Sequence, residues 1–418
     1  MLEEIKTNIN NPEVLEELYR SDRKAFGSAF EKIYPEIETT ESARFWKARL
    51  DFGKTGERTK SPARQEIIAM IVTGLITAIL IKIPDLFTFD VHSSFFYERN
   101  AAIIVFLGLT LFTIWITRIE NLTRLIFLAF AFLIPLIYIN LLPVYKSASV
   151  NLAYIHLPLL MWCIFGIAYT GFDFKDKGKR IDFIRYNGDL AIIYALIASA
   201  GTLLTMITIG LFEAIGMNIQ KFYMNNIFVA GAAAAPVVSA FIIRNYTAYA
   251  NKIAPLIATI FSPLVLLTLL VYLTTIVITG KDPYNDRDFL LVFNIMLIGV
   301  MGIIVFSVTE TSLIRNQKLN ISILFILSII TILIDLIAIS AIFYRLGNFG
   351  ITPNRLAILV SNLLILVNLI IIMTGLFRII FRKLELKTVE LSVANFLPVY
   401  LIWIIIVVFG FPVFFGMK

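Results

Sequence analysis

Residues 320–343 read NISILFILSIITILIDLIAISAIF, a run of 24 residues in which Asp335 is the only charged side chain. A hydrocarbon core about 30 Å thick is crossed by about 20 apolar residues in a helix. Because lipid offers no hydrogen-bond partners, a spanning backbone must satisfy its own donors and acceptors, as a helix or a closed barrel does. Barrel strands alternate in polarity over about ten residues, so this continuous run predicts a membrane-spanning helix.

The same pattern recurs along the chain and predicts an all-α polytopic membrane domain at residues 66–418. Of the 418 residues 59% are hydrophobic, whereas a soluble domain is about 45–50% apolar. We expect about eleven transmembrane helices, at 67–83, 101–117, 125–142, 152–170, 190–212, 223–243, 254–279, 289–309, 320–343, 356–378 and 394–414.

Residues 1–65 are polar and charged, and they lack the apolar segment of a signal peptide. They predict a small N-terminal cytoplasmic helical domain. Its first helix should begin at Asn11-Pro12, because Asn caps helices and Pro suits the first helical position. A second should begin at Ser21-Asp22 and end at Pro35, and a third should begin near Thr40.

The rest of this segment predicts a linker and a core. Gly53 and the stretch 54–62 are typical of a linker. The aromatic residues Phe26, Phe30 and Trp46 either pack this domain together or form a docking surface for a protein partner or the membrane domain.

Basic residues predict the orientation. Of the 36 Lys and Arg residues, 27 lie in the N-terminal segment and in alternate loops on its side of the membrane. The positive-inside rule then places the N-terminus in the cytoplasm and, after eleven spans, the C-terminus in the periplasm. The rule accounts for the net charge of +7 without a nucleic-acid partner. Anionic lipid accounts for the basic loop Asp173–Asp189.

Asp335 is the first candidate functional residue. Ser328, Thr331 and Asp335 follow one another at spacings of three and four residues, on one helix face. A carboxylate in hydrocarbon is costly, and such groups face the bundle interior or a water-filled cavity. Either this face is part of a proton, cation or substrate pathway, or Asp335 is a protonated, hydrogen-bonded packing residue.

The tenth segment carries a narrow polar stripe. Ser361, Asn368 and Gly375 recur every seven residues, with Asn362 beside them. Asn and Ser hydrogen-bond across membrane helices, and small residues let two backbones approach closely. The stripe is either part of a pathway shared with Asp335 or a seam between the ninth and tenth segments.

Two arginines between these segments depart from the positive-inside trend. Arg345 and Arg355 lie in a loop that we expect outside the cytoplasm. Either an anion holds them, such as a carboxylate, a lipid phosphate or a substrate, or they snorkel to headgroups. Thr352-Pro353 is a plausible cap and first residue for the tenth helix.

Segments five to seven are rich in small residues and helix breakers. Gly201, Thr205 and Thr208 lie close on one face, 231–236 reads GAAAAP, and Pro255 and Pro263 interrupt the seventh segment. Transporters use such kinks at binding sites, although kinks also serve packing alone.

Few residues could serve a metal or a cofactor. The chain has one cysteine, Cys163, and two histidines, His92 and His156, which we place in or beside loops outside the cytoplasm. These counts exclude a disulfide framework and disfavour a zinc site. No nucleotide-binding or catalytic motif is present, so we expect no metal, no cofactor and no enzyme.

Four stretches carry a family resemblance. They are NPEVLEELYR at 11–20, FIRYNGD at 183–189, ATIFSPL at 258–264 with Asn251 and Pro255 before it, and YRLGNFGITPNR at 344–355. Together they resemble the bacterial membrane proteins of domain-of-unknown-function family 4153. The resemblance implies a bacterial inner-membrane protein and supplies no agreed activity or catalytic residues.

The leading functional hypothesis is a transporter- or channel-like permease. Asp335 with Asn368 would form a polar site at the membrane midplane, and Arg345 and Arg355 would guard its outer mouth. The second hypothesis is a membrane scaffold or sensor that binds a partner through its N-terminal domain. The third is a membrane-embedded lipid-modifying enzyme.

Overall fold

The structure is a computed structural model and divides into two compact units, Met1–Ala63 and Arg64–Lys418. The residues described are 1–57, 63–86, 95–143, 147–214, 217–279, 284, 287–311, 318–382 and 385–417. His92 therefore lies outside the described residues.

The N-terminal unit contains helices α1 (Leu2–Thr7), α2 (Pro12–Ser21), α3 (Arg23–Ile37) and α4 (Glu41–Glu57). The predicted starts are confirmed, because the side chains of Asn11, Asp22 and Thr40 accept the backbone N–H groups of Val14, Ala25 and Ala43. Leu15, Phe26, Phe30 and Trp46 pack in its core.

Two predicted boundaries in this unit were wrong. Pro35 does not end its helix, since α3 continues to Ile37. A proline removes only one intrahelical hydrogen bond, and the last turn of a helix tolerates that loss better than its interior. Helix α4 likewise continues through Gly53 to Glu57, so the linker can begin only after that residue.

All regular secondary structure in the described part of the second unit is helical. It contains α5 (Arg64–Leu80), α6 (Ile83–Leu86), α8 (Phe96–Thr117), α9 (Leu122–Leu141), α10 (Ala148–Tyr169), α11 (Lys177–Ala214), α12 (Gln220–Phe222), η1 (Tyr223–Phe228), α13 (Val229–Asn245), α14 (Thr247–Thr279), α15 (Arg287–Thr311), α16 (Lys318–Phe349), α17 (Pro353–Arg382), α18 (Lys387–Ile405), η2 (Ile406–Gly410) and α19 (Phe411–Phe414). The segments η1 and η2 are π-helical.

Each of the eleven predicted spans coincides with a helix or a continuous helical run. Within the described residues nine of these are long and apolar enough to cross a membrane. The other two are α5, with 17 residues, and α14, whose described apolar part is Ile257–Val271. The chain is therefore an all-α polytopic membrane protein, as predicted.

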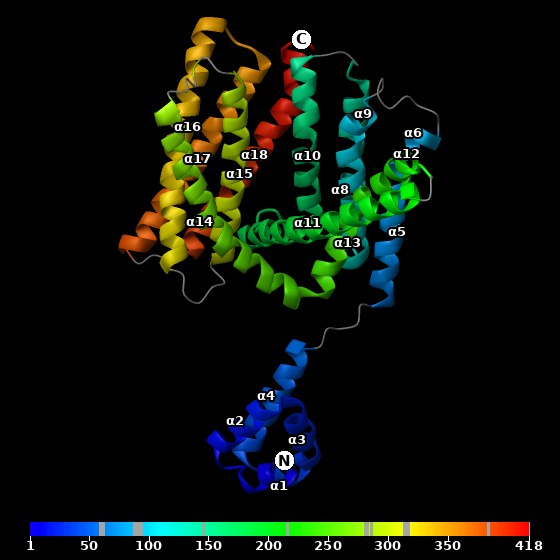
Figure 1. Cartoon of the computed structure of the whole chain (residues 1–418), viewed down its shortest axis with the longest axis vertical. Helices are drawn as coiled ribbons and strands as arrows, with labels where there is room; N and C mark the ends of the chain where they lie inside the picture. Colours follow the sequence, from blue (N-terminus) through cyan, green and yellow to red (C-terminus); the bar gives the residue numbers. More distant parts are fainter. Residues whose placement is uncertain are drawn as a thin grey trace. The chain divides into compact units, whose positions relative to one another are not determined.

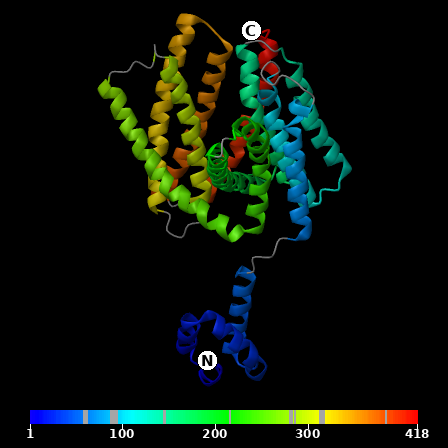
Figure 2. The ribbon, with the colours of Figure 1, turned by 45° about the vertical axis from the view of Figure 1, so that its right-hand side comes forward.

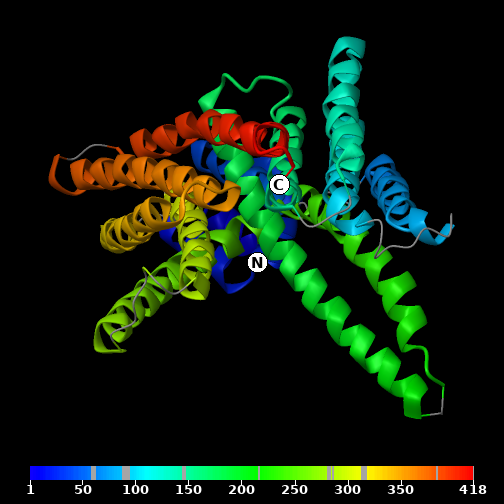
Figure 3. The same ribbon diagram turned by 90° about the horizontal axis from the view of Figure 1, so that it is seen from above.

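Helix α11 runs across its neighbours. Figure 1 shows α10, α15 and α16 running up and down while α11 lies across them, and Figure 2 looks nearly along α11. Seen from above in Figure 3, α11 extends sideways over its whole length. Its 38 residues give it a length of about 57 Å at 1.5 Å per residue. It contacts α10, α13, α14, α15 and α18.

Ion pairs and hydrogen bonds define the two ends of the second unit. Helices α5 and α13 are antiparallel, because Arg244 pairs with Glu66 at 2.9 Å near one end and Lys82 donates to the Asn225 carbonyl at 2.7 Å near the other. We call the end where α5 begins the lower end, as in Figure 1. Helices α8, α10, α15 and α17 finish at the lower end, and α11 and α18 begin there.

Candidate functional site

A cavity of about 660 Å³ lies among α10, α11, α14, α15, α17 and α18. Its volume falls within the range of about 300–1,000 Å³ that is usual for ligand sites. Most of its walls are aliphatic and aromatic side chains, and no Asp, Glu, Lys or Arg is among the described residues that line it.

Two glycines of α15 widen this cavity. Gly299 and Gly302 line it, and a Cβ added at either position would meet no atom within 4 Å. Gly188 of α11 differs, because a Cβ there would lie 2.1 Å from a ring atom of Phe306. Gly188 therefore allows the Phe306 ring to pack directly on the α11 backbone at the cavity wall.

Several polar groups of the cavity bind one another. Trp162 Nε1 donates to Asn187 Oδ1 at 2.9 Å, and the Asn187 amide donates to the Phe183 carbonyl. Ser307 and Ser262 share a hydrogen bond of 2.8 Å. These bonds satisfy much of the hydrogen-bonding capacity of the wall before any ligand arrives.

His156 also lines the cavity. The placement of this residue in or beside a loop was wrong, because it lies in the third turn of α10. Its Nδ1 lies 2.8 Å from the Leu152 carbonyl, so Nδ1 carries the hydrogen in this bond. A neutral ring then presents Nε2 as an acceptor. The described residues contain no group of three His, Cys, Asp or Glu side chains that could hold a metal ion.

The polar stripe of α17 faces α18. Ser361 accepts a hydrogen bond from Trp403 at 3.0 Å, and Asn368 donates to the Tyr400 hydroxyl at 3.0 Å. A Cβ at Gly375 would lie 2.7 Å from a methyl carbon of Val389. The stripe therefore forms a helix–helix seam, which was one of the two interpretations of the sequence. However, these contacts join the tenth segment to the eleventh and not to the ninth.

Asp335 is completely buried, and neither of its carboxyl oxygens has a hydrogen-bond partner among the described residues. Ser328 and Thr331 are buried on the same face, but their hydroxyls donate to carbonyls of their own helix. Asn368 Oδ1 is buried and has no partner within the described part of the chain either. The predicted polar face is present, but no described residue forms a hydrogen bond with the Asp335 carboxyl group.

Tyr400 connects this buried group to the cavity. Its side chain lines the cavity, its hydroxyl accepts from Asn368, and it interacts electrostatically with Asp335. Of the five predicted pathway residues, only Ser361 lines the cavity itself. Asp335 and Asn368 lie behind its wall.

The expectation that both arginines lie in a loop was wrong, because Arg345 belongs to α16 and Arg355 to the first turn of α17. Arg355 donates to the carbonyls of Phe349 and Gly350, at 2.7 Å each, and its guanidinium lies over the Phe349 ring. These carbonyls end α16, where a cation is favourable. Arg345 lies half-buried near the end of α16. Thr352 accepts from the Arg355 N–H, so the predicted cap of α17 is confirmed.

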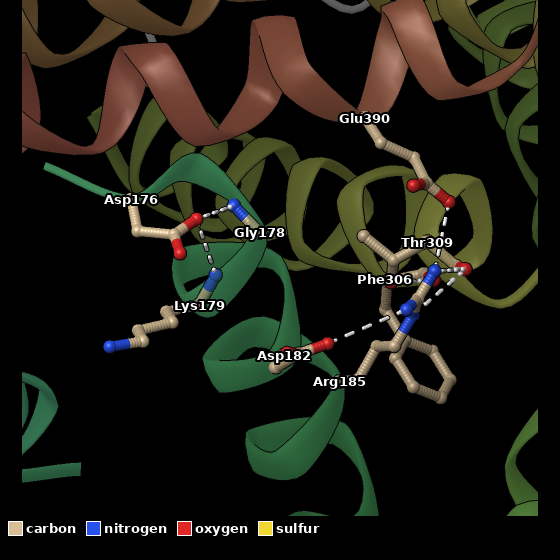
Figure 4. A network of polar contacts seen from close by, with 8 residues as sticks. All are labelled: Asp176, Gly178, Lys179, Asp182, Arg185, Phe306, Thr309 and Glu390. Carbon is tan, nitrogen blue, oxygen red and sulfur yellow. Dashed lines mark hydrogen bonds and ion pairs between the residues drawn. The ribbon is translucent and has the colours of Figure 1, made fainter. Parts of the chain in front are cut away.

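A charged network joins α11 to α15 and α18 at the lower end of the unit (Figure 4). Arg185 of α11 donates to the Thr309 carbonyl at 3.1 Å and to Glu390 at 3.0 Å, and it lies 3.7 Å from Asp182. Thr309 is in the last turn of α15 and Glu390 in the first turn of α18. The cation thus meets a helix C-terminus and the carboxylate stabilises a helix N-terminus, as the two helix dipoles favour.

This network was not predicted from the sequence. We expected a basic loop facing anionic lipid at Asp173–Asp189, whereas α11 already begins at Lys177. Lys179 pairs with Asp173 at 3.0 Å, which lowers the pKa of that carboxyl, and Arg180 donates to the Ala394 carbonyl. Glu390, at the edge of an apolar segment, was the available signal, because a buried carboxylate there needs a basic partner.

A second hollow, of about 620 Å³, lies at the lower end among α8, α10, α11 and α13. Lys179, Asp182 and Arg244 line it, so it is charged where the first cavity is not.

Comparison with known proteins does not assign the chain to a family. No family model matches the chain, no curated protein matches it, and no solved structure matches it.

Proposed function

We propose that the protein is a permease whose substrate occupies the cavity among α10, α11, α14, α15, α17 and α18. The observation that carries the proposal is the cavity itself, about 660 Å³ of open volume inside a bundle of apolar helices. A scaffold has no need of such a space, because voids forfeit packing contacts and lower stability. Ligand sites in membrane bundles lie between helices in this way.

Asp335 is the energy-coupling group in this proposal. An unpartnered carboxyl buried within a spanning helix costs stability, and such residues mark ion or proton pathways. Tyr400, whose side chain lines the cavity, interacts electrostatically with Asp335 and accepts a hydrogen bond from Asn368. Binding of a proton or cation at Asp335 would therefore change the electrostatic environment of a cavity residue.

The setting of this permease is part of the proposal. The basic residues favour a cytoplasmic N-terminus and a periplasmic C-terminus. The resemblance to family 4153 favours a bacterial inner membrane.

The test asks whether the helices around the cavity move. Cys163→Ser removes the only cysteine, so pairs of spin labels can be placed on a cysteine-free chain. One pair, Lys177→Cys with Arg378→Cys, spans exposed sites at the lower end, and another, Asn151→Cys with Asn348→Cys, spans the upper end. Distances are measured by double electron–electron resonance in lipid nanodiscs.

Alternating access predicts at least two distances at one end, and an Asp335→Asn substitution should shift their populations. A single narrow distance at both ends, unchanged by Asp335→Asn, would overturn the permease. Circular dichroism of each variant confirms that the helices remain folded.

One observation favours a second function. Phe45 of the N-terminal unit is 62% exposed, beside the buried Trp46 of its core. An exposed aromatic residue on a charged surface suits a protein partner, as the scaffold hypothesis requires. Loss of a co-purifying protein from Phe45→Ser, but not from the neighbouring Arg44→Ser, would support this function. Equal recovery from both variants would remove it.

A further inference from the structure

The cavity has an apolar mouth at the surface of the bundle. Leu159, Phe261 and Ile298 line the cavity, yet they are 47%, 51% and 60% exposed. Each lies near the middle of its helix, α10, α14 or α15 respectively. The middle of a spanning helix lies at the depth of the hydrocarbon core. The mouth therefore opens sideways toward lipid tails and not toward water.

The walls of the cavity are mostly apolar, as its mouth is. An ion would lose its hydration in the cavity and would find no opposite charge among the described lining residues. The aliphatic and aromatic walls suit apolar chains or rings. Among the described lining residues, Nε2 of His156 remains available to a ligand as an acceptor, and the hydroxyl hydrogens of Ser361 and Tyr400 remain available as donors.

We propose that the cavity binds an uncharged lipophilic molecule that enters from the bilayer through this mouth. The inference rests on the proposed function, and it names the class of the substrate. The ligand carries a long apolar chain and at most a hydroxyl- or ester-type polar end. Two membrane sources share this chemistry, acylglycerols and polyprenols.

Tryptophan fluorescence offers a direct test. Trp162 and Trp403 line the cavity, while the other two tryptophans do not. Trp46→Phe with Trp115→Phe leaves only the cavity pair as reporters. Three dibrominated C18 quenchers are titrated into nanodiscs: a neutral monoacylglycerol, the corresponding carboxylate, and a quaternary ammonium of the same chain. Unlabelled monoacylglycerol and unlabelled polyprenol then compete in separate arms.

The neutral quencher should act saturably, with an apparent affinity at least tenfold above either charged probe. Gly302→Leu should weaken it at least tenfold, because the new side chain fills open space in the cavity. The matched control is Gly201→Leu, on a part of α11 that is also open but does not line the cavity, and it should leave quenching unchanged. Whichever competitor displaces the quencher identifies the source.

Two results would overturn the inference: equal affinity for the charged and neutral probes, or quenching that Gly302→Leu leaves intact. Failure of both competitors would overturn it as well. If the spin-label distances still show two states in any of these cases, only the substrate class is wrong. A single distance would mean that the permease itself is wrong.

Discussion

Removing Arg185 should destabilise the membrane unit more than removing the charge of its partner Glu390. Glu390 is 2% exposed, and its carboxylate accepts from Arg185. Glu310, also buried, interacts electrostatically with the same guanidinium. Arg185→Leu therefore leaves two acidic side chains in a dry site. Breaking a buried pair from one side costs about 3–5 kcal/mol.

Glu390→Gln leaves a different situation. Arg185 keeps two hydrogen bonds to the Thr309 carbonyl and its proximity to Asp182. The charged Arg185 donor then meets a neutral amide oxygen in place of a carboxylate, so the expected loss is only about 1 kcal/mol. The double variant Arg185→Leu with Glu390→Gln should cost less than the two single variants together, because no charge stays unpaired in that pair.

Reversible unfolding in mixed micelles, followed by circular dichroism, measures these free energies. Lys387→Gln, at the start of α18 but outside the network, is the matched control. Two results would refute the reasoning: a loss at Glu390→Gln as large as at Arg185→Leu, or a double variant whose loss equals the sum of the single losses.

Three further predictions follow from other contacts. Gly375→Leu should destabilise the membrane unit by about 1–3 kcal/mol because its Cβ would meet Val389, and Val389→Ala should recover part of that loss in the same unfolding assay. Asp335→Asn should unfold no more easily than the parent, since the carboxyl has no hydrogen-bond partner among the described residues; a loss above about 2 kcal/mol would show that it has one. Hydrogen bonds from Arg20 and Arg49 lower the pKa of Glu16, so its contribution to the N-terminal unit is complete above the ordinary value of 4.5 and is lost as pH falls through the lower value of the folded state. Thermal melts read from Trp46, with the other tryptophans replaced by Phe, should show this acid-side loss, and Glu16→Gln should abolish it.

Helix positions could be read from the sequence because the bilayer fixes their length. Each long apolar run must be helical, whichever neighbours it has. The caps at Asn11, Asp22 and Thr40 were equally predictable, since a cap depends on residues within one turn. Both signals are local.

Which helices pack against each other could not be predicted from the sequence in this way. The stripe of Ser361, Asn368 and Gly375 indicates one face of a helix, but helical periodicity does not say which helix covers that face. The structure covers it with α18, through Trp403, Tyr400 and Val389. Arg185 and Glu390 are 205 residues apart in sequence, and only the packing of α11 on α18 brings them together.

The course of α11 explains why the cavity exists at this place. A helix that crosses its neighbours cannot keep the long parallel seams by which α16 and α17 pack along each other. Close contact is possible only near the crossing, where Gly188 admits the Phe306 ring. One turn before it, Arg185 joins the helix to α15 and α18 through hydrogen bonds. The cavity is lined by the same stretch of α11, at Ile184, Asn187, Gly188, Ala191 and Ile192. Both the charged network and the cavity therefore result from the way α11 crosses its neighbouring helices. Loss of Arg185 should therefore change the spin-label distances at the lower end more than those at the upper end.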